Sequence, residues 1–246
     1  MDPPTGQEPG GTGADGARAR LVGEALGPGH FAHLVGRPET EVARAFKVRA
    51  LQAGVDQIGY LALGSGPGGY DSITRPPGER VLREGDVLAL DAGGTVGGDW
   101  CDFNRNVALG DPAPEAVSAY ARLYDATEVG IQAARPGARA SDVWRAMADV
   151  LGPGMAEGES ASRFGHGVGL GFTEPPSVHP ADHTRLVPGM VLAIEPGLVY
   201  PVAGRLGPRL MVHEENIVVT PDGARLLTER APASLPVVPA FLQENT

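Results

Sequence analysis

The sequence has 246 residues and a formal net charge of −10, which argues against nucleic acid or an anionic membrane as the main partner. No apolar run approaches the roughly 18 residues needed to cross a bilayer. The single cysteine excludes an intrachain disulfide, which fits a reducing compartment, and we therefore expect a cytoplasmic protein.

The chain begins with a segment that need not pack. Residues 1–18 are rich in Gly, Pro and Asp and lack the apolar stretch of a signal peptide, so they predict a disordered leader. No solenoid repeat or low-complexity linker divides the remainder, and residues 19–246 are expected to form one α+β domain. Its first predicted helix is capped by Thr40 and ends at Gly54.

The next predicted elements are strands. A strand around residues 58–63 leads into a glycine-rich loop at 64–70, which lacks the Lys-Ser/Thr pair of a phosphate-binding loop. Residues 87–90 form a buried apolar strand that ends at Asp91. Residues 99–109 are expected to be its antiparallel partner across a glycine-rich turn.

The second half of the chain predicts two helices and several short strands. The Asp-Pro pair at 111–112 opens a long amphipathic helix over roughly 112–134. A shorter helix is expected to be capped by Ser141 and to close at Gly152. Further strands are predicted around residue 166 and at 190–194, 210–220 and 224–229.

Two aspartates at the predicted hairpin point to a metal. Asp91 and Asp102 lie on strands joined by a glycine-rich turn, so both carboxylates can reach one point. The alternative is a strand-end cap at Asp91 and a surface carboxylate at Asp102. The apolar residues flanking both favour burial, and a buried carboxylate pair without a cation is costly. A bound metal would remove that cost.

Three further residues extend this set. His166 lies in the sequence FGHGVGLG, where glycines allow close backbone approach, and Glu195 follows a buried strand and precedes Pro-Gly. Glu214 lies in a predicted strand where alternation places it opposite His213 and Glu215, although the pattern leaves open which of the three points inward. Four carboxylates and a neutral imidazole carry a charge of −4, which balances two divalent cations.

The order Asp, Asp, His, Glu, Glu, in the settings DAG, GHGVGL, EPGL and EENIVVT, resembles the pita-bread (M24) metallopeptidase family. The resemblance covers about residues 35–230 and is closest to the branch of aminopeptidase P, prolidase and creatinase. It implies an α+β fold with a pseudo-twofold, curved antiparallel sheet covered by helices. Members of this branch carry an N-terminal domain that we expect to be absent here, and a homodimer is one way to close the cleft.

The resemblance also implies a role for each ligand. Asp91 would bind one metal, His166 and Glu195 the other, and Asp102 and Glu214 would bridge them. An oxygen-rich set with one imidazole favours Mn, Fe(II), Co or Zn. The implied nucleophile is a metal-bridging hydroxide that attacks a C–N bond of a small-molecule or short-peptide substrate, with Glu195 as proton acceptor.

The chain departs from the family at two positions. The resemblance implies two further catalytic histidines, but their positions hold Thr74 and Thr173. A hydroxyl can donate a hydrogen bond but cannot become a cation at neutral pH, so it would stabilise a transition state less. Thr173, Glu174 and His179 follow the His166 loop, and we take them with Glu195 as candidate catalytic residues.

Two side chains beside the aspartates complete the expected site. Asn104 shares a strand face with Asp102 and suits a hydrogen bond that supports a ligand, whereas Cys101 should face the other way. Three functions stay open. The first is a metal-dependent hydrolase like Xaa-Pro aminopeptidase or prolidase. The second is a non-peptidase enzyme on the same scaffold, such as a dimethylsulfoniopropionate lyase or a creatinase, and the third is a non-catalytic binding module.

Overall fold

The computed structural model describes residues 34–152 and 163–239. The predicted leader at 1–18 lies outside these residues. The described chain combines helices with antiparallel sheets, as the α+β prediction requires. Within the described residues, no helix has both the length and the apolar character that a membrane span needs.

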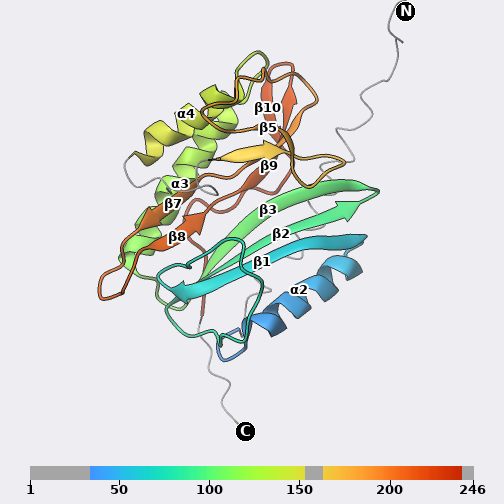
Figure 1. The fold of residues 1–246 in the computed structure, drawn as a ribbon. Helices are drawn as coiled ribbons and strands as arrows, with labels where there is room; N and C mark the ends of the chain where they lie inside the picture. The colour runs from blue at the N-terminus through green and yellow to red at the C-terminus, as the bar shows by residue number, and fades with distance from the viewer. Residues whose placement is uncertain (1–33, 153–162, 240–246) are drawn as a thin grey trace, which may run out of the picture.

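The first half of the chain forms a helix and the strands of one sheet. Helix α2 (Glu39–Gln52) precedes β1 (Gln57–Pro67), β2 (Asp86–Val96) and β3 (Asp99–Leu109). These strands pair in the order β1-β2-β3, and β11 (Val237–Val238) adds to the free edge of β3. In Figure 1, α2 runs along the outside of this sheet.

Tertiary contacts move the start of α2 away from the expected cap. The helix begins at Glu39, and Thr40 lies inside its first turn. The Glu39 carboxylate is buried and accepts hydrogen bonds from Ser65 Oγ and from Arg75 Nη2, at 2.5 and 2.8 Å. These partners come from β1 and from the segment after it, so the sequence around the helix does not reveal them.

Two strands run further than predicted. Residues 64–67 continue β1 instead of forming a loop, because they pair in register with residues 86–89 at the start of β2. Strand β2 likewise continues past Asp91 to Val96. The predicted partner strand, 99–109, has the bounds observed for β3. Asp91 therefore lies within a long hairpin and not at the end of a strand.

The second half places two helices against short strands. Helix α3 spans Pro114–Ala133 and α4 spans Ala140–Leu151. Arg139 and not Ser141 is the N-cap residue of α4, and its backbone N–H donates to Asp142 Oδ2. The strands are β4 (Gly165–Gly167), β5 (Glu174–Ser177), β6 (Val191–Ile194), β7 (Gly197–Tyr200), β8 (Arg209–Val212), β9 (Glu215–Thr220) and β10 (Gly223–Leu226).

The predicted strand at 210–220 is two strands. Strand β8 ends at Val212 and β9 begins at Glu215, so His213 and Glu214 lie in a break. Strand β8 pairs with β7, whereas β9 joins the sheet of order β10-β9-β6-β4-β5. The last predicted strand, 224–229, ends at Leu226. The break frees Glu214 from the strict alternation of a strand.

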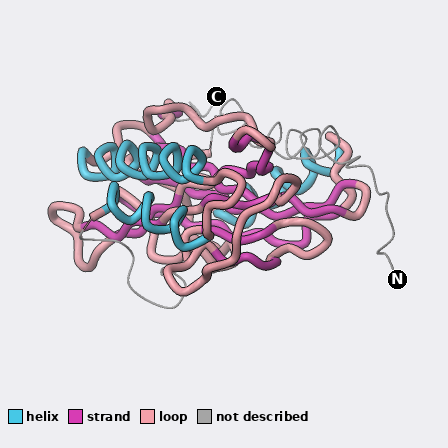
Figure 2. Tube along the Cα trace, turned by 90° about the horizontal axis from the view of Figure 1, so that it is seen from above, coloured by secondary structure: helices cyan, strands magenta, loops and turns pink. Residues whose placement is uncertain are grey.

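The buried apolar residues of the described chain form two cores. One core packs α3 and α4 against the second sheet, with Leu123, Met147 and Ile217 fully buried. The other packs α2 against the first sheet around Phe46 and Phe103. Figure 2 shows α3 and α4 lying side by side along the strands. The two sheets meet where β3 contacts β9.

Candidate metal centre

The β2–β3 hairpin places its two aspartates on one face. Asp91 pairs with Asn104, and Asp102 pairs with Gly93. Asn104 and Asp102 are two residues apart on β3, so their side chains project to the same side as that of Asp91. The hairpin geometry expected from the sequence is therefore present.

The other sheet supplies the histidine and the glutamates. His166 is the central residue of β4 and pairs with Ala193 of β6. Gly165 has φ +143°, and a Cβ at this position would lie 2.2 Å from the Ala193 carbonyl oxygen. Only glycine lets β4 approach β6 this closely. Glu195 follows β6, and Glu214 lies in the break between β8 and β9.

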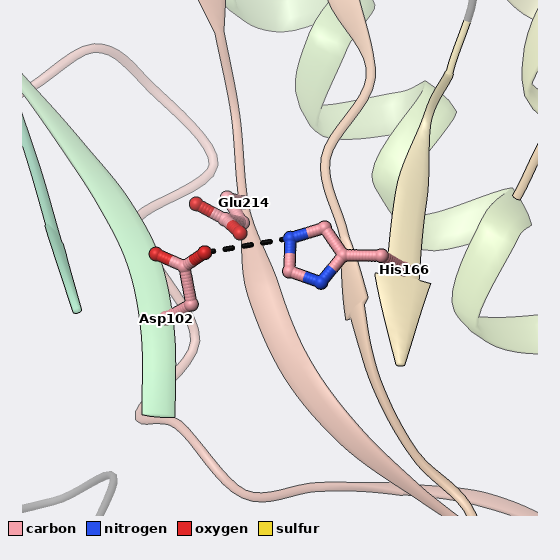
Figure 3. Close-up of side chains that lie close together, drawn as sticks. All are labelled: Asp102, His166 and Glu214. Carbon is pink, nitrogen blue, oxygen red and sulfur yellow. Dashed lines mark ion pairs between the residues drawn. The ribbon is translucent and has the colours of Figure 1, made fainter. Parts of the chain in front are cut away.

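The side chains from the two sheets converge. Nε2 of His166 lies 3.4 Å from Oδ2 of Asp102 and 3.7 Å from Oε1 of Glu195. One potential ligand atom from each of Asp102, His166 and Glu214 lies within 4.8 Å of the others, and all three residues are buried (Figure 3). This spacing suits a shared cation, with Asp91 on the neighbouring strand.

Burial and mutual repulsion disfavour the ionised carboxylates. Burial is the largest cause that raises the pKa values of Asp91 and Glu214, and repulsion from Asp102 adds to both. Burial also raises the pKa of Glu195 to about 6. Burial lowers the pKa of His166, but the side-chain hydrogen bond with Asp102 and the charge of Glu195 outweigh it and raise the pKa overall. Nearby positive charge would lower the pKa values of these carboxyl groups and favour their ionised forms.

Several oxygens at this site lack a partner. Asp91 Oδ1, Asp102 Oδ1 and Glu214 Oε1 are buried and accept no hydrogen bond from any described residue. Each buried polar atom left in this way costs about 1–3 kcal/mol. A divalent cation would satisfy all three oxygens, and oxygen ligands with one imidazole suit Mn, Fe(II), Co or Zn. The residues present therefore fit the group that the sequence predicts.

A cavity of about 660 Å³ gives access to the site. Asp91, Asp102, His166 and Glu195 contribute to its lining. Two aromatic residues that the sequence did not single out also line it: the rings of Tyr60 and Phe172 lie 4.8 Å apart.

A glycine makes room for this aromatic wall. A Cβ at Gly93 would lie 2.3 Å from Cε2 of Phe172, so the absence of a side chain lets the Phe172 ring lie against β2. The Phe172 ring also lies 6.1 Å from the ring of His166, between centroids. The cavity is thus partly apolar beside the acidic cluster.

Two arginines also line the cavity and bring positive charge to it. Arg163 Nη2 lies 3.4 Å from Glu195 Oε1. Arg209 Nη1 lies 2.5 Å from Asp71 Oδ1, and the Arg209 side chain is 15% exposed. Neither arginine belongs to a motif that sequence reasoning recognised, because each is brought to the cavity only by folding.

Thr74 and two of the candidate catalytic residues, Thr173 and His179, lie in different places in the structure. Thr74 lines the cavity, and its hydroxyl lies 3.3 Å from Ser72 Oγ. Thr173 is exposed and does not contribute to the cavity lining. His179 lies outside this lining too, in a turn where its Nδ1 accepts a hydrogen bond from the Ala181 N–H.

Glu174 lies on the far side of the sheet from the metal ligands. It lines a second cavity of about 440 Å³ together with Cys101, which alternates with Asp102 along β3. Its Oε1 accepts a hydrogen bond from the Gly171 N–H. The structure therefore does not place Thr173, Glu174 and His179 in the lining of the cavity beside the proposed metal ligands. The reason is that β5 pairs with β4 and directs this segment elsewhere.

His213 and Glu215, the neighbours of Glu214 in the chain, are buried and form contacts outside the acidic cluster. His213 points away from the cluster, and its Nδ1 lies 3.0 Å from the Thr127 hydroxyl of α3. Burial lowers the pKa of His213 well below its usual value, and nearby Arg230 lowers it further. Glu215 pairs with Arg105 and Arg230 at 3.1 and 3.3 Å. Of the three residues, Glu214 faces the site.

Comparison with known proteins places the chain in a broader context. A family model described as metallopeptidase family M24 matches residues 14–221. The protein named "Probable dipeptidase PepE" from Mycobacterium tuberculosis is 37% identical over 206 residues, which cover 83% of this chain and 53% of that protein. The chain spans about half the length of the curated relatives it matches.

Solved structures agree with this match. Dipeptidase PepE from Mycobacterium ulcerans gives a TM-score of 0.80 at 31% identity, over 94% of this chain and 61% of that one. X-Pro aminopeptidase from Thermotoga maritima gives a TM-score of 0.81 at 21% identity, over 94% and 64%, which is a likeness of fold. These likenesses confirm the pita-bread fold that the sequence motifs predict.

Proposed function

Because the chain belongs to metallopeptidase family M24, we propose that it is a divalent-metal-dependent hydrolase that cleaves the C–N bond of dipeptides or similar short amides. The observation that carries this proposal is the buried cluster of Asp102, His166 and Glu214 beside a cavity of about 660 Å³. Partnerless carboxylate oxygens in the cluster support cation binding. The relatives named as dipeptidases support the substrate class.

We assign the five side chains to two cations. Asp91 would hold one, His166 and Glu195 the other, and Asp102 and Glu214 would lie between them. The spacing of the Asp102, His166 and Glu214 atoms supports the proposal that Asp102 and Glu214 contact both cations. When bound, such cations would polarise a carbonyl group and lower the pKa of a water molecule that contacts them, which makes a nucleophile available at neutral pH. Manganese is our first choice among Mn, Fe(II), Co and Zn, because four of the five ligands are carboxylates.

Glu195 is the proposed proton carrier. Its side chain is 14% exposed and lines the cavity, so it can exchange a proton with a substrate lying there. A general acid or base must lie within hydrogen-bond reach of the reacting group and must be able to change protonation state near the working pH. Arg163 contacts Glu195 and would limit how far this carboxylate turns.

The cavity supports recognition of a short, partly apolar substrate with a carboxylate. Tyr60 and Phe172 offer an apolar wall, and Arg163 and Arg209 offer positive charge. Guanidinium groups bind carboxylates through paired hydrogen bonds.

We further propose a cytoplasmic homodimer. The thiol of the only cysteine, Cys101, is buried and its pKa is raised, and a reduced thiol of this kind is compatible with a reducing compartment.

The test is a substrate panel with the metal supplied. Purified protein with Mn²⁺ would be given Xaa-Pro dipeptides, other dipeptides and their C-terminal amides, and free amino acids would be quantified by chromatography. We expect metal-dependent hydrolysis that Asp102→Asn abolishes. Protein that binds the metal but releases no amino acid from any peptide would contradict the proposal.

A second function is favoured by one specific observation. The described lining of the cavity contains Thr74 and only one histidine, His166. A site without a second imidazole stabilises a peptide-bond transition state less well, which favours a non-peptidase reaction such as those of the lyase or creatinase type. Small betaine and amidino compounds added to the same panel would detect it. Turnover of one of these without peptide hydrolysis would select this second function.

A further inference from the structure

A buried amide opposite a proposed metal ligand lacks a partner. Asn104 is 2% exposed, and its Nδ2 donates to no described residue. Asp91 is its direct cross-strand partner in the β2–β3 hairpin, and Asp91 Oδ1 likewise accepts no hydrogen bond. Directly opposed residues on one strand face are close enough for their side chains to interact. An unused donor and an unused acceptor thus occupy neighbouring positions on the same face.

A directional chain of hydrogen bonds sets the orientation of this amide. Asn106 Nδ2 donates both to Asn104 Oδ1 at 2.8 Å and to the Val212 carbonyl at 2.6 Å. Asn106 Oδ1 in turn accepts from the Tyr70 hydroxyl at 3.3 Å, and that hydroxyl accepts from the Val212 N–H at 2.6 Å. Because its oxygen is already used, Asn104 has its NH₂ group left as a donor.

A purely architectural role explains only part of this chain. Tyr70 and Asn106 tie β3 to β8 and have their hydrogen bonds satisfied. The same role leaves the Asn104 NH₂ group buried without an acceptor, which native proteins rarely tolerate. Asp91 is the better acceptor than Asp102, because it lies directly opposite, whereas Asp102 lies two residues along the same strand and faces His166.

We propose that Asn104 is a positioning residue for the metal centre. In the metal-bound protein its NH₂ group would donate a hydrogen bond to one oxygen of Asp91 and so hold the other oxygen toward a divalent cation. Hydrogen bonds to ligating carboxylates fix their orientation, and losing one typically weakens metal affinity by about 10–100-fold. The proposal rests on the proposed metal-dependent function and adds the residue that prepares the Asp91 ligand.

A matched pair of variants tests the donor without changing shape. Asn104→Thr and Asn104→Val have side chains of nearly the same size, and both lose the Asn104 carboxamide, but only threonine keeps a hydroxyl donor. Zn²⁺ affinity would be measured by competition with a chromophoric chelator. We expect Asn104→Val to bind about 10–100-fold more weakly than the wild type, and Asn104→Thr to stay within a few-fold of it. Equal affinities of the two variants would overturn the proposal.

A second measurement covers the case in which Asn104→Val does not fold. In ¹⁵N-labelled wild-type protein, the Asn104 side-chain NH₂ signal is assigned by its absence in Asn104→Thr. Zn²⁺ addition should shift this signal and protect it from hydrogen exchange, and a signal that Zn²⁺ leaves unchanged would overturn the proposal. Wild-type protein that binds no Zn²⁺ at all would instead refute the proposed function on which this inference rests.

Discussion

Nε2 of His166 lies 3.4 Å from Oδ2 of Asp102, although His166 belongs to β4 of one sheet and Asp102 to β3 of the other. The candidate site therefore exists only when both halves of the chain are folded and in contact. Glu214 joins the pair from the break between β8 and β9. Metal binding should accordingly depend on these side chains and should stabilise the folded state, because the unfolded chain does not bring them together.

Loss of either member of this pair should remove the metal and the activity together. Asp102→Ala and His166→Ala each delete a side chain from the converging group, so we expect neither bound metal nor peptide turnover. Elemental analysis after gel filtration and a dipeptide assay measure the two effects. His179→Ala is the control, because His179 lies outside the cavity lining and its removal should leave both properties unchanged. Turnover in both deletion variants would show that other residues carry the reaction.

Replacing two adjacent glutamates by glutamine should change the stability of the metal-free protein in opposite directions. Glu214→Gln replaces a carboxyl group whose ionised form is disfavoured by burial and by its acidic neighbours, so it should stabilise the metal-free protein while abolishing metal binding. Glu215→Gln breaks the ion pairs with Arg105 and Arg230, whose side chains are 14% and 16% exposed, and should destabilise the protein by about 3 kcal/mol. Urea denaturation of the metal-free variants measures both changes. A loss of stability in both variants would mean that Glu214 is a structural residue.

The metal-free protein should lose stability as the pH rises. The pKa of Glu195 is raised from 4.5 to about 6, so the folded state binds its proton more tightly than the unfolded state does. This contribution, about 2 kcal/mol, is complete below pH 4.5 and is lost as the pH rises through about 6. The raised pKa values of Asp91 and Glu214 act with the same sign.

Denaturation of chelator-treated protein between pH 4.5 and 7.5 measures this dependence. Protein loaded with Mn²⁺ provides the comparison, because a cation favours the ionised carboxylates and should remove the decline. A metal-free protein whose stability is constant or increases over this range would show that burial does not raise the pKa values of these carboxyl groups.

Introducing a histidine should raise dipeptide turnover at Thr74 but not at Thr173. Thr74 lines the cavity, so Thr74→His would place an imidazole beside a bound substrate. A donor of this kind is typically worth about 10²–10³-fold in turnover, and we expect a gain of at least about 10-fold. Thr173→His should have little effect, because Thr173 is exposed and outside the lining. Dipeptide turnover numbers decide the matter, and a gain at Thr173 with none at Thr74 would contradict this placement.

The sequence predicted which candidate ligand side chains lie close together better than it predicted their surroundings. Asp91 and Asp102 could be placed together because a hairpin register follows from strand alternation and a short turn. The break at residues 213–214 could not be foreseen, because His213 and Glu215 are satisfied by Thr127, Arg105 and Arg230 from distant segments. A polar pattern of this kind looks solvent-exposed until those partners are known.

The cavity lining was missed for a similar reason. Tyr60 and Phe172 have no motif of their own and meet only when β1 and the loop after β4 pack together. The same holds for the position of Glu174 outside this lining, because the pairing of β5 with β4 sets the direction of its side chain. Local sequence fixes the chemistry of a ligand, whereas the shape of the space around it depends on contacts between segments.

The most direct test of the metal site is the number of metal equivalents that each chain binds. Wild-type protein would be saturated with Mn²⁺, separated from free metal by gel filtration and examined by elemental analysis. Asp91, Asp102, His166, Glu195 and Glu214 together predict two equivalents per chain. A chain that retains no metal under these conditions would contradict the account, and a chain that retains a single equivalent would contradict the dinuclear assignment.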